Sequence, residues 1–187
     1  MTKVSLLVVS LILLSYFFIN CGNYSVNDKK TYSFIEWNPY LKDSIKTTFL
    51  LDSTFAPSPH GITCFDDGST CHVFDYNSCK ITINYGPFTK GPINSSKHAG
   101  EGHINKIMDA YPNAKISQQK IFKSGMLEGV MTESVISDLY RIDYDGCNEE
   151  MLMAFNIHLE AKDRQLNYSD IVVSLINSIS IEPVAGF

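Results

Sequence analysis

The sequence predicts an α+β domain in which an antiparallel β-sheet is covered by two main helices. Two observations lead to this fold class. Short segments in which apolar and polar residues alternate follow one another between turn signals, as is typical of antiparallel strands. Residues 103–113, in the middle of the chain, and residues 168–180, near its end, have helical periodicity instead. A chain dominated by strands, with separate helices, favours a sheet with helices packed over it.

The first half of the domain is predicted to consist of strands. Residues 45–51 form the first of them, and a segment with two prolines and a glycine, residues 56–61, is predicted to turn the chain. Residues 71–76 and 81–86 are predicted to form a hairpin around a turn at 77–80.

The first helix is predicted at residues 103–113. Its apolar residues have the i, i+3, i+4, i+7 spacing of one helix face, and Pro112 and Asn113 are expected to end it. The residues on this face are Ile104, Ile107, Met108 and Tyr111.

Three more strands are predicted after this helix, at residues 114–122, 126–136 and 139–144. Asp145 and Gly146 follow the third of them. Because Asp-Gly is a common hairpin signal, we expect the chain to turn there into the next strand.

That next strand, residues 149–161, has the clearest pattern in the chain. Its apolar residues alternate strictly with the others and are expected to share the buried face; they are Met151, Met153, Phe155, Ile157 and Leu159. Asn156, His158 and Glu160 are then expected to share the opposite face.

The second helix, at residues 168–180, has Ser169 as its predicted N-cap and Pro183 just beyond its end. Its apolar residues form one stripe along the helix, as expected for a helix that covers a sheet. They are Ile171, Val172, Leu175, Ile176 and Ile179.

The order of these elements resembles that of the PsbP/Mog1-like sandwich found in small envelope lipoproteins. The shared features are a string of antiparallel strands, a helix inserted midway, a long hairpin and a closing helix, and they span most of the chain after its N-terminal segment. The resemblance implies a sandwich fold. It rests on element order and involves no motif, so no functional residue of that family is carried over.

The N-terminal segment predicts export from the cytoplasm. Lys3 is followed by a mostly apolar run from Val4 to Ile19, which has the charge and length of a signal peptide. As a helix this run would rise roughly 24 Å, which is short of the ~30 Å hydrocarbon core of a bilayer.

The end of this run, Phe18 to Cys21, resembles the lipobox of bacterial lipoproteins, and the polar residues after it resemble a tether. The resemblance implies that the Cys21 thiol takes a diacylglycerol and that cleavage leaves Cys21 as the first mature residue. The strict pattern prefers Leu where this chain has Phe18, and Gly, Ala or Ser where it has Asn20; spirochaete lipoboxes are looser. An ordinary signal peptide cut nearby and an uncleaved anchor are the alternatives.

These features divide the chain into a signal peptide at residues 1–20, a lipid attachment site and polar tether at 21–33, and a single domain at 34–187. The expected location is the cell envelope, at the bacterial outer membrane or cell surface. The chain carries 15 basic and 20 acidic side chains. Because it has no cluster of Lys and Arg, we expect no nucleic-acid partner.

The cysteine count supports an oxidising compartment. The chain has five cysteines, so lipidation of Cys21 leaves an even set for two disulfides, namely Cys64, Cys71, Cys79 and Cys147. The expected pairs are Cys64 with Cys71 and Cys79 with Cys147, although three connectivities are open. A zinc site built from Cys64, Cys71, His72 and Cys79 is the alternative, but its spacings lack the close CxxC pair that structural zinc sites favour.

One histidine cluster could bind a metal. His98, Glu101 and His103 offer two imidazoles and a carboxylate, which suit a divalent cation. Two glycines between them argue against a helix, so a solvated loop is the simpler interpretation.

The sequence contains no nucleophile elbow, metalloprotease helix or phosphate-binding loop. We therefore expect a binding or structural module without enzymatic activity and without a cofactor. Its expected partners are the membrane, through the N-terminal lipid, and a protein or small-molecule ligand. The alternative is a metal-dependent or His-based hydrolase that uses His98, Glu101 and His103.

Overall fold

The computed structural model of the chain describes residues 28–64, 69–88, 104–105, 107–162 and 167–184, with the backbone alone at residues 60–64, 118 and 124.

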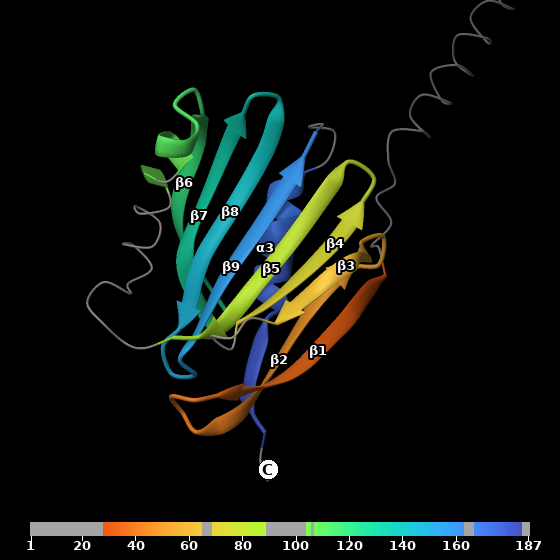
Figure 1. The fold of residues 1–187 in the computed structure, drawn as a ribbon, viewed down its shortest axis with the longest axis vertical. Helices are drawn as coiled ribbons and strands as arrows, with labels where there is room; N and C mark the ends of the chain where they lie inside the picture. Colours follow the sequence, from red (N-terminus) through yellow and green to blue (C-terminus); the bar gives the residue numbers. More distant parts are fainter. Residues whose placement is uncertain (1–27, 65–68, 89–103, 106, 163–166, 185–187) are drawn as a thin grey trace, which may run out of the picture.

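Seven strands form a large antiparallel sheet (Figure 1). In spatial order they are β3 (Ala56–Cys64), β4 (Thr70–Tyr76), β5 (Cys79–Pro87), β9 (Met153–Ala161), β8 (Leu139–Asn148), β7 (Leu127–Ile136) and β6 (Lys115–Ser124). A second sheet has the order β1 (Lys29–Asn38), β2 (Asp43–Asp52) and β10 (Ser180–Pro183). One helix, α3 (Tyr168–Ser178), lies beside β2 and contacts β8 and β9.

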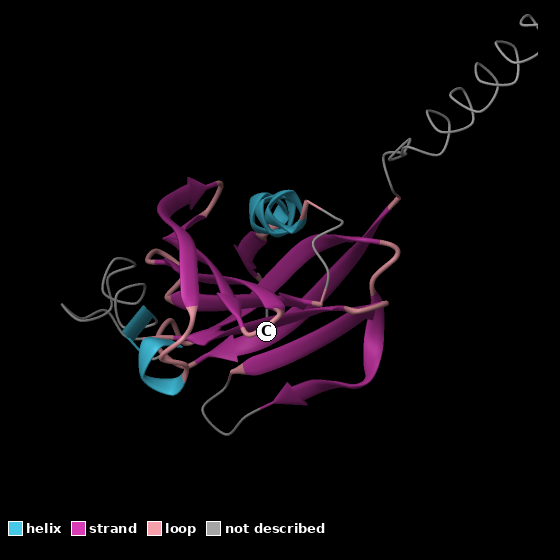
Figure 2. Ribbon diagram, turned by 90° about the horizontal axis from the view of Figure 1, so that it is seen from above, coloured by secondary structure: helices cyan, strands magenta, loops and turns pink. Residues whose placement is uncertain are grey.

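The core lies between the large sheet and the layer formed by the small sheet and α3. Figure 2 shows α3 end-on, against one side of the strands. We call this side of the large sheet its inner face and the opposite side its outer face. The alternation predicted for β9 is confirmed for Met153, Phe155, Ile157 and Leu159, which are all buried on the inner face. Met151, predicted to share this face, lies in the turn before the strand and is only partly buried. The stripe of α3 is buried against them through Val172, Leu175 and Ile176.

The prediction of a sheet covered by two main helices is wrong. In the described part of the chain, α3 shares the covering layer with a three-stranded sheet, and the structure is mostly antiparallel β-sheet. The other predicted helix is a short element, helical at residues 104–105 and 107–110. The sequence interpretation missed β1 because its polar first residues were assigned to the tether at 21–33, whereas the strand begins at Lys29.

The turn predicted at residues 56–61 is part of strand β3. Pro57 and Pro59 are compatible with a strand here because β3 is an edge of the sheet and pairs with β4 alone. The register with β4 is irregular between Pro57 and Ile62, as expected where a proline cannot donate a hydrogen bond.

The hairpin predicted at Asp145–Gly146 is also wrong, since both residues lie within β8. The chain turns later, after Asn148. Its side chain accepts a hydrogen bond from the backbone N–H of Met151 (2.7 Å) and donates one to the carbonyl of Met126 (2.8 Å). Leu152, in this turn, has a φ of 47°. Asn148 therefore organises the turn into β9, which the sequence analysis had placed at Asp145 and Gly146.

The N-cap of α3 is Asn167, two residues before the predicted N-cap Ser169. Asn167 occupies the N-cap position without a side-chain capping bond. Ser169 instead donates a hydrogen bond from its hydroxyl to Oε1 of Glu133, at 3.0 Å. The serine thus attaches the helix to β7.

Candidate functional site

Several residues singled out in the sequence lie outside the described residues. They are the lipidation candidate Cys21 and the metal-site candidates His98, Glu101 and His103. In the ranges that the structure does describe, no helix has both the length and the apolar composition needed to cross a bilayer.

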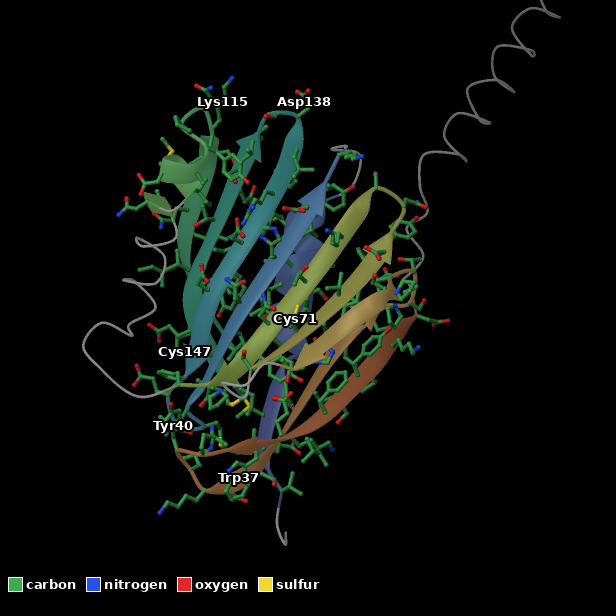
Figure 3. The ribbon with its side chains drawn as sticks, in the orientation of Figure 1. Trp37, Tyr40, Cys71, Lys115, Asp138 and Cys147 are labelled. Atoms are coloured by element: carbon green, nitrogen blue, oxygen red, sulfur yellow. The ribbon has the colours of Figure 1, made fainter. Side chains whose placement is uncertain are left out.

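The expected disulfide between Cys79 and Cys147 is not formed. Cys79 is buried on the inner face of β5. Cys147, labelled in Figure 3, lies on the outer face of β8, near the end of that strand that leads to β9. The strand register places Cys79 in line with Tyr140, and the seven residues from there to Cys147 span about 23 Å along the strand. A disulfide needs Cα atoms within about 7 Å.

The other cysteine predictions concern β3 and β4. In the register, Cys64 is opposite Thr70 and Cys71 is opposite Thr63, so the two cysteines are not direct cross-strand partners. Cys71 and His72 are consecutive in β4 and therefore point to opposite faces, which does not suit a common zinc site. Among the described residues no group of three His, Cys, Asp or Glu side chains converges as a metal site would.

The thiols of the outer face are poor nucleophiles. Burial raises the pKa of the Cys71 thiol. Burial also raises the pKa of Cys147, and the negative charges of Glu149 and Glu128 raise it further. Because the thiolate is the reactive form, neither cysteine has the environment of a catalytic one.

The outer face instead has a network of charged side chains around His158. Asp143 accepts hydrogen bonds from Nε (2.8 Å) and Nη2 (3.1 Å) of Arg141, and its carboxylate also contacts Nδ1 of His158. The other ring nitrogen, Nε2, lies 2.9 Å from Oε1 of Glu160. Asp143 is only 1% exposed. Both nitrogens of His158 are thus occupied by carboxylates, which favours a structural role over proton transfer to a substrate.

Replacing the buried carboxylate should destabilise the domain. In Asp143→Asn the charge that faces both Arg141 and His158 is lost, and we expect the free energy of unfolding to fall by about 2 kcal/mol. Glu160→Gln, in the more exposed position, should cost less, about 0.5 kcal/mol. Urea unfolding of both variants checks this, and equal effects would contradict the ranking.

A different surface has the properties of a binding site. Three large apolar or aromatic side chains lie exposed on the hairpin formed by β1 and β2: Ile35 (55% exposed), Trp37 (58%) and Tyr40 (50%). Trp37 is the only tryptophan in the chain. Figure 3 shows Trp37 and Tyr40 at the same end of the molecule. We call Ile35, Trp37 and Tyr40 the hairpin surface.

The alternation of β1 explains why these side chains point outward. Tyr32, Phe34 and Glu36 face the large sheet. Because successive side chains of a strand point to opposite faces, Ile35 and Trp37 face solvent. The inward aromatic rings are held by close ring contacts. Phe34 lies 4.0 Å from the ring of His72, measured between centroids, and Tyr32 lies 4.8 Å from that of Phe74.

Asn38 fixes the turn that carries Tyr40. Its side chain is buried, donates a hydrogen bond to the carbonyl of Met151 (3.0 Å), and accepts bonds from the backbone N–H groups of Tyr40 (3.0 Å) and Leu41 (3.2 Å). The first hairpin is thereby attached to the β8–β9 turn. Tyr40 consequently has a defined position relative to Trp37.

A polar cluster between the sheets holds β1 in place. Glu36 accepts hydrogen bonds from Thr70 and Tyr85, and desolvation raises its pKa despite these bonds. Nε2 of His72 is 3.0 Å from the hydroxyl of Tyr85. Since the Tyr85 hydroxyl donates to Glu36, it accepts from a protonated Nε2 of His72. Burial lowers the pKa of His72 to about 4, so its ring is neutral near pH 7.

The lowered pKa of His72 should make the domain less stable in acid. Its unfolded-state pKa is about 6.5. Between pH 6.5 and about 4, His72 is protonated in the unfolded chain and neutral in the folded domain. The free energy of unfolding therefore falls by about 1.4 kcal/mol per pH unit as the pH decreases through this range. The raised pKa of Glu36 has the opposite sign: its stabilisation is lost as the pH rises above its unfolded value.

Comparison with His72→Gln separates the two effects. Glutamine keeps a donor and does not titrate, and Glu36 is common to both proteins. The stability of the wild type relative to this variant should therefore increase from pH 4 to pH 6.5, measured by urea unfolding at a series of pH values. A difference that does not change with pH would show that His72 does not titrate as described.

Sequence reasoning missed the hairpin surface because part of β1 was assigned to the tether. The usable signal was the alternation of Tyr32 and Phe34 with Ser33 and Ile35, which continues to Trp37.

The comparisons with known proteins bear on the fold. No protein-family model matches the sequence, and no curated protein matches it. The crystal structure of the Ran-binding protein Mog1p from Saccharomyces cerevisiae is similar, with a TM-score of 0.52 and 8% sequence identity over 82% of this chain and 95% of that chain. A structure of a Mog1 point mutant matches with a TM-score of 0.50, at the same identity and over the same shares. The resemblance to the PsbP/Mog1-like sandwich is therefore confirmed for the fold: this chain has a Mog1-like fold.

Proposed function

We propose that the chain is a lipid-anchored protein of the cell envelope whose domain binds another protein through the hairpin surface. The observation that carries the proposal is the exposure of the chain's only tryptophan, Trp37, beside Ile35 and Tyr40. Singly exposed apolar residues are normal, but three large ones on one hairpin are typical of an interaction site.

The residue types favour a protein partner. Trp and Tyr are enriched at the centres of protein interfaces, because they bury a large apolar area and can still donate a hydrogen bond. The similar structure of Mog1p is that of a Ran-binding protein, so one protein with this fold binds another protein. A shared fold does not identify the partner, and the proposal rests on the surface of this chain.

The N-terminal segment supports a location at the membrane. Cys21 precedes β1 by eight residues, which can span roughly 28 Å at most. A lipid on Cys21 would keep the domain close to the bilayer and would restrict its partners to proteins of the envelope.

Labelling with palmitate tests the anchor. The full chain, expressed in a bacterial host, should incorporate labelled fatty acid, and Cys21→Ala should abolish the label because the modified thiol is lost. Cys147→Ala is the matched control and should keep it. Loss of the label in the control alone, or no label in the wild type, would contradict lipidation at Cys21.

Site-specific photo-cross-linking tests the binding site. A photoreactive amino acid at Ile35 in the full chain should form an adduct with one envelope protein in intact cells. The control position is Ile121 on β6, which is 68% exposed and lies outside the hairpin surface. Adducts of equal yield at both positions, or none at Ile35, would contradict the proposal.

A further inference from the structure

The two sheets have four edge strands, and three of them carry features that block pairing with another chain. β3 contains Pro57 and Pro59, which cannot donate hydrogen bonds at those positions. β10 is short and ends at Pro183. β6 carries three lysines along its length: Lys115, Lys120 and Lys123. Prolines, short length and lysines are the usual means by which proteins protect sheet edges.

The fourth edge, β1, carries lysines only at its first two residues, Lys29 and Lys30, and not along its length. It is ten residues long and contains no proline, and among the described residues it pairs with β2 alone. Figure 1 shows it along the outer border of the molecule. From Thr31 to Asn38 it carries no lysine. An edge of this kind can accept a further strand.

We infer that β1 pairs in antiparallel fashion with β1 of a second copy of this chain, about a two-fold axis at Ser33. Such pairing joins the two small sheets into one. The register follows from the faces of the strand, because directly opposite residues must lie on the same side of the joined sheet. A two-fold axis through Ser33 meets this condition and uses the strand from Lys29 to Trp37 in both copies.

Charge complementarity favours this register and favours a second copy of the chain as the pairing partner. The axis at Ser33 places Lys30 of one copy opposite Glu36 of the other, and symmetry forms the pair twice. Shifting the axis by one residue to Phe34 would place Lys30 opposite Asn38 and remove both ion pairs. The basic start and acidic end of β1 thus complement a second β1 strand running in the opposite direction.

Glu36 has a carboxylate oxygen whose hydrogen-bonding capacity is unused. Its Oε2 is buried without a hydrogen-bond partner, while its carboxyl group receives bonds from Thr70 and Tyr85. Lys30 is exposed and lies over the ring of its own Tyr32, 5.4 Å from the centroid. On the other face, the same register places Lys29 opposite Trp37, and the Lys29 ammonium already donates a hydrogen bond to Ser174 of its own helix α3 (2.7 Å).

This pairing goes beyond the proposed function and does not depend on it. It uses the backbone edge of β1, whereas the hairpin surface uses side chains of the hairpin, two of which, Ile35 and Trp37, lie on the same strand. The identity of the adduct distinguishes the two: a photo-adduct at Ile35 with a second copy supports the pairing, and one with a different protein supports the proposed function.

A cysteine at the two-fold axis tests the pairing in the full chain. In Ser33→Cys the two thiols would lie directly opposite each other, so mild oxidation or a short bismaleimide should give a covalent dimer on a non-reducing gel. The matched control is Thr48→Cys. Thr48 is the cross-strand partner of Ser33 on β2, with hydroxyls 3.1 Å apart, but it would lie three strand spacings, about 14 Å, from its copy. The control should stay monomeric under oxidation.

A charge reversal tests the register. In the Ser33→Cys background, Lys30→Glu places like charges opposite each other at two positions and should lower the dimer yield about threefold or more. Lys115→Glu on the β6 edge makes the same charge change and should leave the yield unaltered. A monomeric Ser33→Cys, an adduct of Ser33→Cys with a different protein, or equal effects of the two charge reversals would overturn the proposal.

Discussion

Replacing Trp37 with alanine should weaken the complex with the envelope partner by about 30- to 800-fold. This range corresponds to the 2–4 kcal/mol that a central interface tryptophan contributes. Trp37 is 58% exposed in the free domain, so a partner that covers it removes a large aromatic area from water. Titration of the purified partner, identified by the adduct at Ile35, measures the change in affinity.

Three further measurements make this expectation specific. Trp37→Phe keeps an aromatic ring and should lose less affinity than Trp37→Ala. Ile121→Ala truncates an exposed apolar residue on β6 and should leave the affinity unchanged. Because Trp37 lies on the solvent side of β1, Trp37→Ala should change the free energy of unfolding by less than about 1 kcal/mol. Unchanged affinity in Trp37→Ala would exclude the hairpin surface as the binding site.

A methyl group added at Gly129 should lower the free energy of unfolding by about 3 kcal/mol or more. Gly129 in β7 is directly opposite Gly146 in β8, and the ring of Tyr144 occupies the space beside them. A Cβ at position 129 would lie 2.6 Å from Cα of Gly146 and 2.7 Å from Cζ of Tyr144, closer than non-bonded carbons approach. Tyr144 is fully buried, so its ring cannot move aside without disturbing the core.

The matched control is Gly125→Ala in the β6–β7 turn. A Cβ there meets only the carbonyl of Asn177, at 4.0 Å, and the cost comes from the φ of 52° alone. We expect about 1 kcal/mol for that change. Urea unfolding of both variants gives the comparison, and a Gly129→Ala protein as stable as Gly125→Ala would contradict the close packing of the two glycines.

The strands and helices that could be predicted from the sequence are those with one buried face and one face exposed to solvent. β9 is the best example, because Phe155, Ile157 and Leu159 alternate with polar residues. The apolar stripe of α3 was visible for the same reason. The hairpin of β4 and β5 was predicted from the turn residues between them and was confirmed by their pairing.

The parts that could not be predicted depend on contacts distant in sequence. β1 begins with two lysines, and its inward Tyr32 and Phe34 are partly buried because residues of β4 lie across from them. β3 has two prolines that are tolerated only at a sheet edge, which no local pattern identifies. For this reason the sequence analysis predicted two helices over the large sheet, whereas the structure has one helix, α3, and a small three-stranded sheet there.

The candidate site shows the same division. The sequence correctly grouped Asn156, His158 and Glu160 on one face of β9, as the strand register confirms. It could not show that Asp143 from β8 contacts one ring nitrogen of His158 and that Arg141 bonds Asp143, while Glu160 occupies the other nitrogen. The outward position of Trp37 was missed because the first residues of β1, which start the alternation, were assigned to the tether.

The most direct test of the hairpin surface is the ¹⁹F spectrum of the chain labelled with 5-fluorotryptophan. Because Trp37 is the only tryptophan, the labelled protein gives one resonance, and tryptophans of an unlabelled partner are silent. On addition of the partner that cross-links at Ile35, this resonance should shift or broaden in proportion to the complex formed. Complex formation that leaves the Trp37 resonance unchanged would show that the partner binds elsewhere and would contradict the proposed function of this surface.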